Sequence, residues 1–256
     1  MKASNASKIQ RIVYSALFAA VLLWSFTGLD ISPERLIRGI PQLWGTLLAM
    51  FAHPDWSYAP DVMTGLRESV QIAVIGTLIG SVLALPFGAI AATNITPFRF
   101  ISSGGKLVLG AVRTFPELVL ALVFIKALGP GAFAGALAVG FHSIGTMGKL
   151  YAERIEATEE GAIEALRATG ASPLQVFCHA IWPDITPDLL SFALYRLDIN
   201  VRAATILGIV GAGGVGTLLQ FQIGKDWPKV GLILLGIIVT VGCIDAISSR
   251  LRAKLV

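Results

Sequence analysis

The chain has 256 residues, of which 55% are hydrophobic and only 14% are charged, well below the roughly 25% of charged residues in ordinary soluble domains. This composition argues against a water-soluble domain, because the surplus apolar surface must face lipid. The net charge of +4 does not indicate nucleic-acid binding, since the basic residues form no stripe and the sequence contains no nucleic-acid-binding motif. The two cysteines, Cys178 and Cys243, have neither metal-ligand nor disulfide-scaffold spacing, and we expect both to be reduced.

The first apolar run extends from Ile12 to Leu29 and follows three basic residues, so a secretory signal peptide is one interpretation. The run is long for a signal peptide, and no small-x-small cleavage site precedes the polar region from Asp30 to Arg38. The sequence therefore favours a retained anchor helix as the first membrane span. The three preceding basic residues are Lys2, Lys8 and Arg11.

The segment from Pro33 to His53 mixes charged residues with apolar residues at helix-like spacing. This pattern is typical of an amphipathic helix that lies in the membrane interface without crossing it. Its apolar members are Leu36, Ile37, Ile40, Leu43, Trp44 and Leu47.

Six apolar runs approach the roughly 20 residues that a helix needs to cross the hydrocarbon core. We expect Pro86 and Gly88 to bend the second run, and Gly129, Pro130 and Gly131 to make a tight turn between the third and fourth. The predicted spans are 12–29, 70–93, 107–128, 130–149, 187–210 and 229–248.

An even number of spans places both termini on one side, and the excess of basic residues predicts that this side is the cytoplasm. The opposite side also carries basic residues, so the bias is moderate. On the predicted cytoplasmic side are Lys2, Lys8, Arg11, Arg99, Lys106, Lys149, Arg154, Arg167, Arg250, Arg252 and Lys254.

The longest predicted cytoplasmic loop runs from Tyr151 to Asp184. A helix through Glu164 to Arg167 should stop at Gly170, which tolerates the left-handed conformation. A second helix should follow, with Ser172 as its cap and Pro173 in its first turn. We expect Pro183 to end it. Two short helices joined by a tight turn suit a rigid projection that receives force from a partner. An ordinary structured loop has the same pattern of helix-start and helix-stop residues, so both interpretations stay open.

The spacing of Glu164-Ala165, Gly170 and Pro183 resembles the EAA motif of ABC importer permeases, with Leu166 in place of the second motif alanine. The location of the motif between the fourth and fifth spans agrees with this resemblance. The implied fold is an all-α integral membrane protein of about six transmembrane helices, the type I importer permease fold with a cytoplasmic coupling helix-turn-helix. Residues 1–61 would form the N-terminal span and external amphipathic segment. Residues 62–256 would form the transmembrane core, with its coupling loop at 151–184.

The segment from Phe192 to Gly216, which includes LYRLDINVRAATILGIVGAGGVG, is similar to the phosphonate permease branch of that family. The resemblance implies a multi-pass protein of the bacterial inner membrane. Its implied partners are a second permease copy, two cytoplasmic ATPase subunits that bind ATP and magnesium, and an external phosphonate-binding protein. It also implies that Glu164, Ala165, Gly170, Ser172, Pro173 and Pro183 couple the permease to the ATPase.

Gly211, Gly213 and Gly216 satisfy a GxGxxG pattern, which in other contexts marks a dinucleotide site. Here the pattern follows an apolar span rather than a short buried strand, so we interpret it as a packed segment near the external mouth. The chain contains no GxxxxGK[ST] loop, and ATP hydrolysis would have to come from another chain.

Ionisable residues within the predicted spans are candidates for the translocation pathway, because they are costly in a membrane and usually face a partner or water. Arg113 and Glu117 are four residues apart, as are Asp198 and Arg202, so each pair could instead neutralise itself on one helix face. His142 and Asn200 could join either network. Gly211 and Gly213 complete the candidates for the pathway.

The sequence thus predicts an importer permease for phosphonate, with phosphite, hypophosphite or phosphate as alternatives and an amino acid or betaine as more distant ones. A different class is an intramembrane enzyme that uses His142, Glu117 and Asp198. This second hypothesis lacks a metal-ligand motif and a nucleophile beside a base, and it leaves the helix-turn-helix loop unexplained.

Overall fold

The helices of the computed structural model follow the apolar runs of the sequence, and the predicted all-α fold is confirmed. The structure describes residues 2–29 and 32–255, within which all regular structure is helical. The predicted polar region that starts at Asp30 begins outside the described residues. The chain divides into two compact units, Met1–Leu48 and Ala49–Val256. The predicted domain boundary at residue 61 lies within the second unit, inside α3 (Ala59–Ala91).

The first unit contains α1 (Lys2–Gly28) and most of α2 (Pro33–Phe51). The stretch Gln10–Gly28 of α1 is long and apolar enough to cross a membrane, which agrees with the first predicted span. The amphipathic segment forms α2 as expected, with Glu34 3.7 Å from Arg38 one turn later. The location of α2 at a membrane interface stays a prediction.

The second unit is a bundle of helices that starts with the end of α2, the short helix η1 (Trp56–Tyr58) and α3. Its remaining helices are α4 (Arg99–Thr114), α5 (Glu117–Leu128), α6 (Ala132–Glu156), α7 (Glu160–Ala168), α8 (Pro173–Val176), η2 (Phe177–Ile181), α9 (Trp182–Leu207), η3 (Gly208–Val210), α10 (Val215–Gln222) and α11 (Trp227–Arg252).

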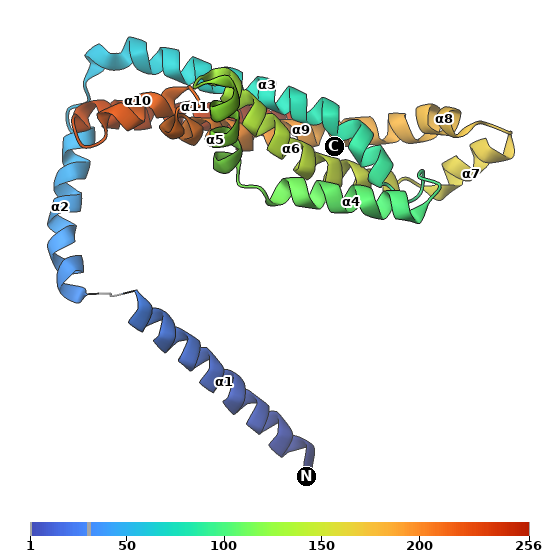
Figure 1. Ribbon diagram of the computed structural model, residues 1–256, viewed down its shortest axis with the longest axis horizontal. Helices are drawn as coiled ribbons and strands as arrows, with labels where there is room; N and C mark the ends of the chain where they lie inside the picture. Colours follow the sequence, from blue (N-terminus) through green and yellow to red (C-terminus); the bar gives the residue numbers. More distant parts are fainter. Residues whose placement is uncertain (1, 30–31, 256) are drawn as a thin grey trace. The chain divides into compact units, whose positions relative to one another are not determined.

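The centre of this bundle is α6, which packs against α3, α4, α5 and α9. Figure 1 shows α3 running beside α6 over most of its length. Small residues allow this close approach: a Cβ atom at Gly76 of α3 would lie 2.8 Å from Cγ1 of Val139 on α6. Dispersion contacts between closely spaced backbones therefore hold α3 and α6 together.

Three described helices are long and apolar enough to cross a membrane, or five spans if each of two bent helix pairs counts as one. The predicted fourth span forms α6 but lies outside this set, because its buried faces carry many small and polar residues. Each predicted span coincides with a helix or a bent pair, and the number of crossings stays a prediction. The three helices are Gln10–Gly28, Trp56–Ala91 and Trp227–Arg252.

The third predicted span, 107–128, is not one continuous helix. The chain bends by 84° between α4 and α5. Phe115 precedes Pro116, and the proline ring disfavours helical backbone at the preceding residue. Phe115 accordingly adopts extended angles, φ −70° and ψ 124°.

The expected helix end at Pro183 is wrong, since the helix continues from α8 through η2 into α9. The segment η2 is a π-helix, and the Trp182 N–H donates to the Phe177 carbonyl five residues back. The wider turn changes the hydrogen-bond pattern just before Pro183, so the missing N–H and the proline ring are accommodated. The predicted loop is also shorter than expected, because Tyr151 to Glu156 belong to α6.

Candidate functional site

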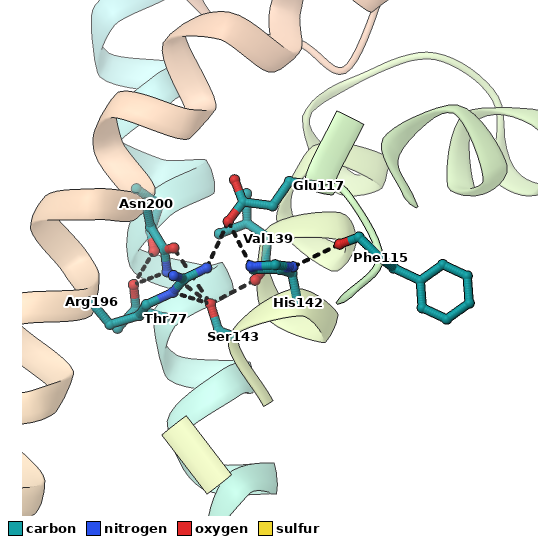
Figure 2. Close-up of polar contacts among 9 residues, drawn as sticks. Thr77, Phe115, Glu117, Val139, His142, Ser143, Arg196 and Asn200 are labelled. Carbon is teal, nitrogen blue, oxygen red and sulfur yellow. Dashed lines mark hydrogen bonds and ion pairs between the residues drawn. The ribbon is translucent and has the colours of Figure 1, made fainter. Parts of the chain in front are cut away.

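A network of polar side chains lies at the centre of the bundle, where α3, α5, α6 and α9 meet (Figure 2). Arg196 of α9 connects these helices. Its Nη2 atom lies 2.7 Å from Oε1 of Glu117 on α5, and its Nε donates to Oγ of Ser143 on α6 at 2.9 Å. The Arg196 side chain is only 7% exposed and that of Glu117 is 21% exposed. A buried charge is tolerated when it is paired and hydrogen-bonded, and both conditions hold here.

Asn200 extends the network by one helical turn of α9. Its amide nitrogen donates to Oγ1 of Thr77 on α3 at 2.8 Å and to Oγ of Ser143 at 3.2 Å. Asn200 and Ser143 are fully buried. Because these bonds join three helices, the network fixes the relative rotation of α3, α6 and α9.

His142 closes the network on the side of α5. Its Nδ1 lies 3.0 Å from the Phe115 carbonyl and its Nε2 lies 3.4 Å from Oε1 of Glu117 (Figure 2). The Phe115 carbonyl is free for this contact because the helix has broken at Pro116. His142 and Asn200, both predicted from the sequence as pathway candidates, are thus brought into one cluster with Glu117.

The alternative in which Arg113 pairs with Glu117 on one helix face does not hold. The bend at Pro116 separates the last turn of α4 from the first turn of α5, so a spacing of four no longer aligns the side chains. Glu117 turns to Arg196 and His142 instead. Within the described part of the chain, no carboxylate forms an ion pair with Arg113.

Asp198 and Arg202 do form the expected ion pair within α9. The Asp198 side chain is 5% exposed, whereas that of Arg202 is 51% exposed. Asp198 is two positions after Arg196, a rotation of about 200° at 3.6 residues per turn, so this pair lies on the opposite face of α9 from the network. The Oδ1 atom of Asp198 is buried and has no hydrogen-bond partner among the described residues.

The glycine-rich segment forms the turn before α10, with positive φ angles at Gly211 (91°), Gly213 (80°) and Gly214 (78°). It lines a cleft of about 520 Å³ with the start of α3. The N–H of Gly214 donates to Glu68 at 3.0 Å, and the N–H of Val215 donates to Ser69 Oγ at 3.0 Å. These amides already bind the protein's own side chains, which opposes a phosphate-binding role.

The predicted helix-turn-helix is present as α7 and α8, which we call the α7–α8 corner. Gly170 adopts the left-handed conformation at φ 82°, as its position after α7 predicted. Ser172 caps α8 in a capping box with Gln175, and Pro173 lies in the first turn. Glu164 and Ala165 are exposed on α7, whereas Pro183 lies on α9 and not in the corner.

A salt-bridge cluster fastens the base of the corner. Arg154, near the end of α6, lies 3.1 Å from Asp184 and also pairs with Asp188, both on α9. Arg154 also donates to the Asp184 carbonyl at 3.2 Å. The two helices that carry the α7–α8 corner are therefore joined directly beneath it.

Sequence reasoning missed Arg196, Ser143, Thr77 and Arg154. A signal for Arg196 was present, since it lies within a predicted span with no acidic residue four positions away and must therefore find a partner on another helix. Within the described residues, no group of three or more histidine, cysteine or acidic side chains is placed to hold a metal ion.

Comparison with known proteins identifies relatives over most of the chain. Residues 84–255 match the family described as binding-protein-dependent transport system inner membrane component. The phosphite transport system permease protein PtxC of Stutzerimonas stutzeri is 38% identical over 92% of this chain and 86% of its own. The phosphate-import permease protein PhnE of Mycolicibacterium smegmatis is 35% identical over 97% of this chain and 47% of its own.

One solved structure, an inward-facing conformation of the MetNI methionine ABC transporter, is 20% identical with a TM-score of 0.69. The match covers 79% of this chain and 99% of that chain. At this identity the likeness shows the fold alone, which is the predicted fold of type I ABC importer permeases.

Proposed function

Because the chain belongs to the family of binding-protein-dependent transport system inner membrane components, we propose that it is the permease subunit of an ATP-driven importer for phosphonate or a related phosphorus oxyanion. Members of this family are transport subunits rather than enzymes. The substrate class is supported by relatives named for phosphite and phosphate. Phosphite, hypophosphite and phosphate remain the alternatives within that class.

One observation carries the transport mechanism: α6 and α9 connect the α7–α8 corner to the buried network. These helices have 25 and 26 residues, so each is about 37–39 Å long at a rise of 1.5 Å per residue. Arg154 joins them at the corner, while Arg196, Asn200 and Ser143 join them in the centre. A displacement applied to the corner is therefore transmitted along two stiff helices to the middle of the bundle.

The partners follow from this assignment. Two cytoplasmic ATPase subunits, which bind ATP and magnesium, would dock on the α7–α8 corner through Glu164, Ala165, Gly170, Ser172 and Pro173. Pro183 would act within α9, at the π-helical turn, rather than at the docking surface. A second copy of the permease and an external phosphonate-binding protein would complete the importer in the bacterial inner membrane.

The predicted pathway residues divide into three groups. Glu117, His142 and Asn200 would form the central layer around Arg196, through which the helices rearrange. Gly211 and Gly213 would shape the external mouth, and Arg202 would offer its guanidinium to the moving oxyanion while Asp198 limits the affinity. Arg113, on α4, belongs to none of these three groups.

Reconstitution tests the function directly. We expect the permease, its ATPase subunits and its binding protein in liposomes to accumulate phosphonate, or one of phosphite, hypophosphite and phosphate, only when ATP is present. Methionine is the control solute. Absence of uptake for all four phosphorus compounds, or methionine uptake in their place, would refute the proposed substrate class.

The coupling role of the corner has its own test. Valine at residue 170 should distort the turn, because a β-branched residue disfavours positive φ by about 1–3 kcal/mol. We expect Gly170→Val to leave the fold intact and to uncouple ATP hydrolysis from uptake. Gly161→Ala is the matched control, since Gly161 lies in α7 with open space around an added Cβ. Unchanged hydrolysis and uptake in Gly170→Val would contradict the assignment.

Cysteine labelling tests the orientation, with both termini and the corner expected in the cytoplasm. A cysteine introduced near Ser4, or at the exposed Glu159 beside Thr158, should react only after the cells are opened. Labelling of either position from outside intact cells would show that the orientation is wrong.

A further inference from the structure

A cleft of about 570 Å³ lies between α4 and α6, outside the central network. Three cationic side chains line it: Lys106 and Arg113 from α4, and Lys149 from α6. Two carboxylates, Glu153 and Glu156, also line it, so the cleft carries one positive charge in excess. Its volume is sufficient for a small oxyanion with part of its hydration shell.

The positive charges in this cleft are not equally neutralised. Lys106 Nζ lies 2.8 Å from Glu156, and Lys149 Nζ lies 3.5 Å from Glu153. Arg113 has no carboxylate partner within the described residues, since the break at Pro116 has turned Glu117 toward Arg196. The excess charge of the cleft is therefore located at Arg113.

The cleft also leads in a defined direction. Its Arg113 end adjoins the central layer: a Cβ at Gly145, three residues after His142, would lie 2.7 Å from the Arg113 backbone nitrogen. Its other end reaches Glu156, the last residue of α6 before the α7–α8 corner. The spacing of seven positions from Lys106 to Arg113 corresponds to about 10 Å of helix. The cleft thus runs from the central layer to the end of the bundle that carries the corner.

From this arrangement we propose that the α4–α6 cleft is the exit route of the transported phosphorus oxyanion, and that Arg113 binds the anion transiently after it passes the central layer. The identity of the anion rests on the proposed function. The planar guanidinium offers paired N–H donors that match a phosphorus oxyanion, and no carboxylate competes for them. Further along, Glu153 and Glu156 weaken the hold of the two lysines, which favours release.

The first experiment compares Arg113→Gln and Arg113→Lys in the reconstituted importer, with phosphite and phosphonate as solutes. Loss of a charged hydrogen-bond partner should lower uptake about tenfold in Arg113→Gln, while ATP hydrolysis stimulated by the loaded binding protein stays within about twofold. Arg113→Lys should retain more uptake than Arg113→Gln because it keeps the charge. Lys126→Gln, at an exposed lysine of α5, is the matched control.

Two outcomes of this experiment would overturn the proposal. One is unchanged uptake in Arg113→Gln. The other is an equal loss of uptake and hydrolysis, which would mean that Arg113 supports the coupled structure rather than the solute. If the unaltered importer moves no phosphorus oxyanion, the proposed function fails and the cleft is judged by the second experiment alone.

The second experiment needs no transported solute. Gly110 lines the cleft, and an added Cβ there meets no atom within 4 Å. In a chain with Cys178→Ser and Cys243→Ser, Gly110→Cys should react at least about threefold faster with an anionic methanethiosulfonate than with a cationic one of similar size. Added inorganic phosphate should slow the anionic reaction. Equal rates for the two reagents, or no effect of phosphate, would contradict an anion route.

Discussion

Two ion pairs on α9 are built in opposite ways. Arg196 faces the interior and pairs with Glu117, which lies 79 positions earlier in the chain on α5. Asp198 pairs with Arg202 one turn further along the same helix. The first pair exists only when α5, α6 and α9 are assembled, whereas the second needs α9 alone. The ion pair between helices therefore depends on assembly of the bundle, whereas the ion pair within α9 depends only on the conformation of that helix.

The largest effect should come from breaking the pair between helices. Glu117→Ala leaves the Arg196 guanidinium buried without a carboxylate, which should cost about 3–5 kcal/mol in the free energy of unfolding. Denaturant unfolding of the purified protein in detergent measures this loss. The double variant Glu117→Leu with Arg196→Met should recover most of it, because no buried charge remains. If Glu117→Ala were as stable as the unaltered protein, the ion pair between helices would not stabilise the fold more than the pair within α9.

Breaking the pair within α9 should have a smaller effect. Arg202→Met leaves the Asp198 carboxylate unpaired, with an expected loss of about 1–3 kcal/mol. Replacing both residues, Asp198→Leu with Arg202→Met, should restore the yield of assembled complex.

Uptake by this double variant then separates two roles of Arg202. If Arg202 guides the oxyanion, uptake should stay low although assembly is restored. Full uptake would show that the pair only neutralises itself. The same measurement on Glu117→Leu with Arg196→Met shows whether the pair between helices also serves transport.

A weaker pairing between helices occurs where Arg154 of α6 contacts Asp184 and Asp188 of α9. The Arg154 side chain is 22% exposed, so each pair should contribute about 1 kcal/mol or less. We expect Arg154→Gln to change global unfolding little but to speed amide hydrogen exchange at the start of α9. Lys225→Gln, at an exposed lysine between α10 and α11, is the control. Equal exchange in both variants would mean that the cluster does not hold the corner.

The smallest effect should be confined to α8. Ser172→Ala removes one half of the capping box, for an expected cost of about 1 kcal/mol. Exchange should increase at the amide of Gln175, which donates to the Ser172 hydroxyl at 3.4 Å. Ser103→Ala, at an exposed serine inside α4, should leave α8 unaffected. A change of exchange across the whole bundle would show that the cap acts beyond its own turn.

These contrasts also explain which features the sequence could predict. The α7–α8 corner was predicted closely because Gly170, Ser172 and Pro173 act on their immediate neighbours. The pair of Asp198 with Arg202 was found for the same reason, since a spacing of four is visible in the chain. Arg196 was missed because its partner lies far away in sequence and on another helix.

The two errors at proline positions have related causes. Pro116 lies within a predicted span and breaks it, whereas Pro183 was expected to end a helix that continues. Proline removes one hydrogen bond in both places, but the fate of the helix depends on whether neighbouring groups can compensate. At Pro116 the helix breaks and the Phe115 carbonyl contacts His142, whereas at Pro183 the helix continues through the π-helical turn η2. Neither compensation is visible from the proline itself.

The turn η2 has an evolutionary consequence. A π-helical turn contains one residue more than the α-helical turn that it replaces, so deletion of one residue between Phe177 and Ile181 would leave the helix on both sides in phase. Deletion at a later point, between Trp182 and Arg196, would rotate Arg196 by about 100° away from Glu117. Removing the surplus residue would, however, bring the ring of Pro183 against a carbonyl one turn earlier. We therefore expect that a homologous chain without the additional residue of η2 also lacks the proline at the position of Pro183, and that a chain with one has the other.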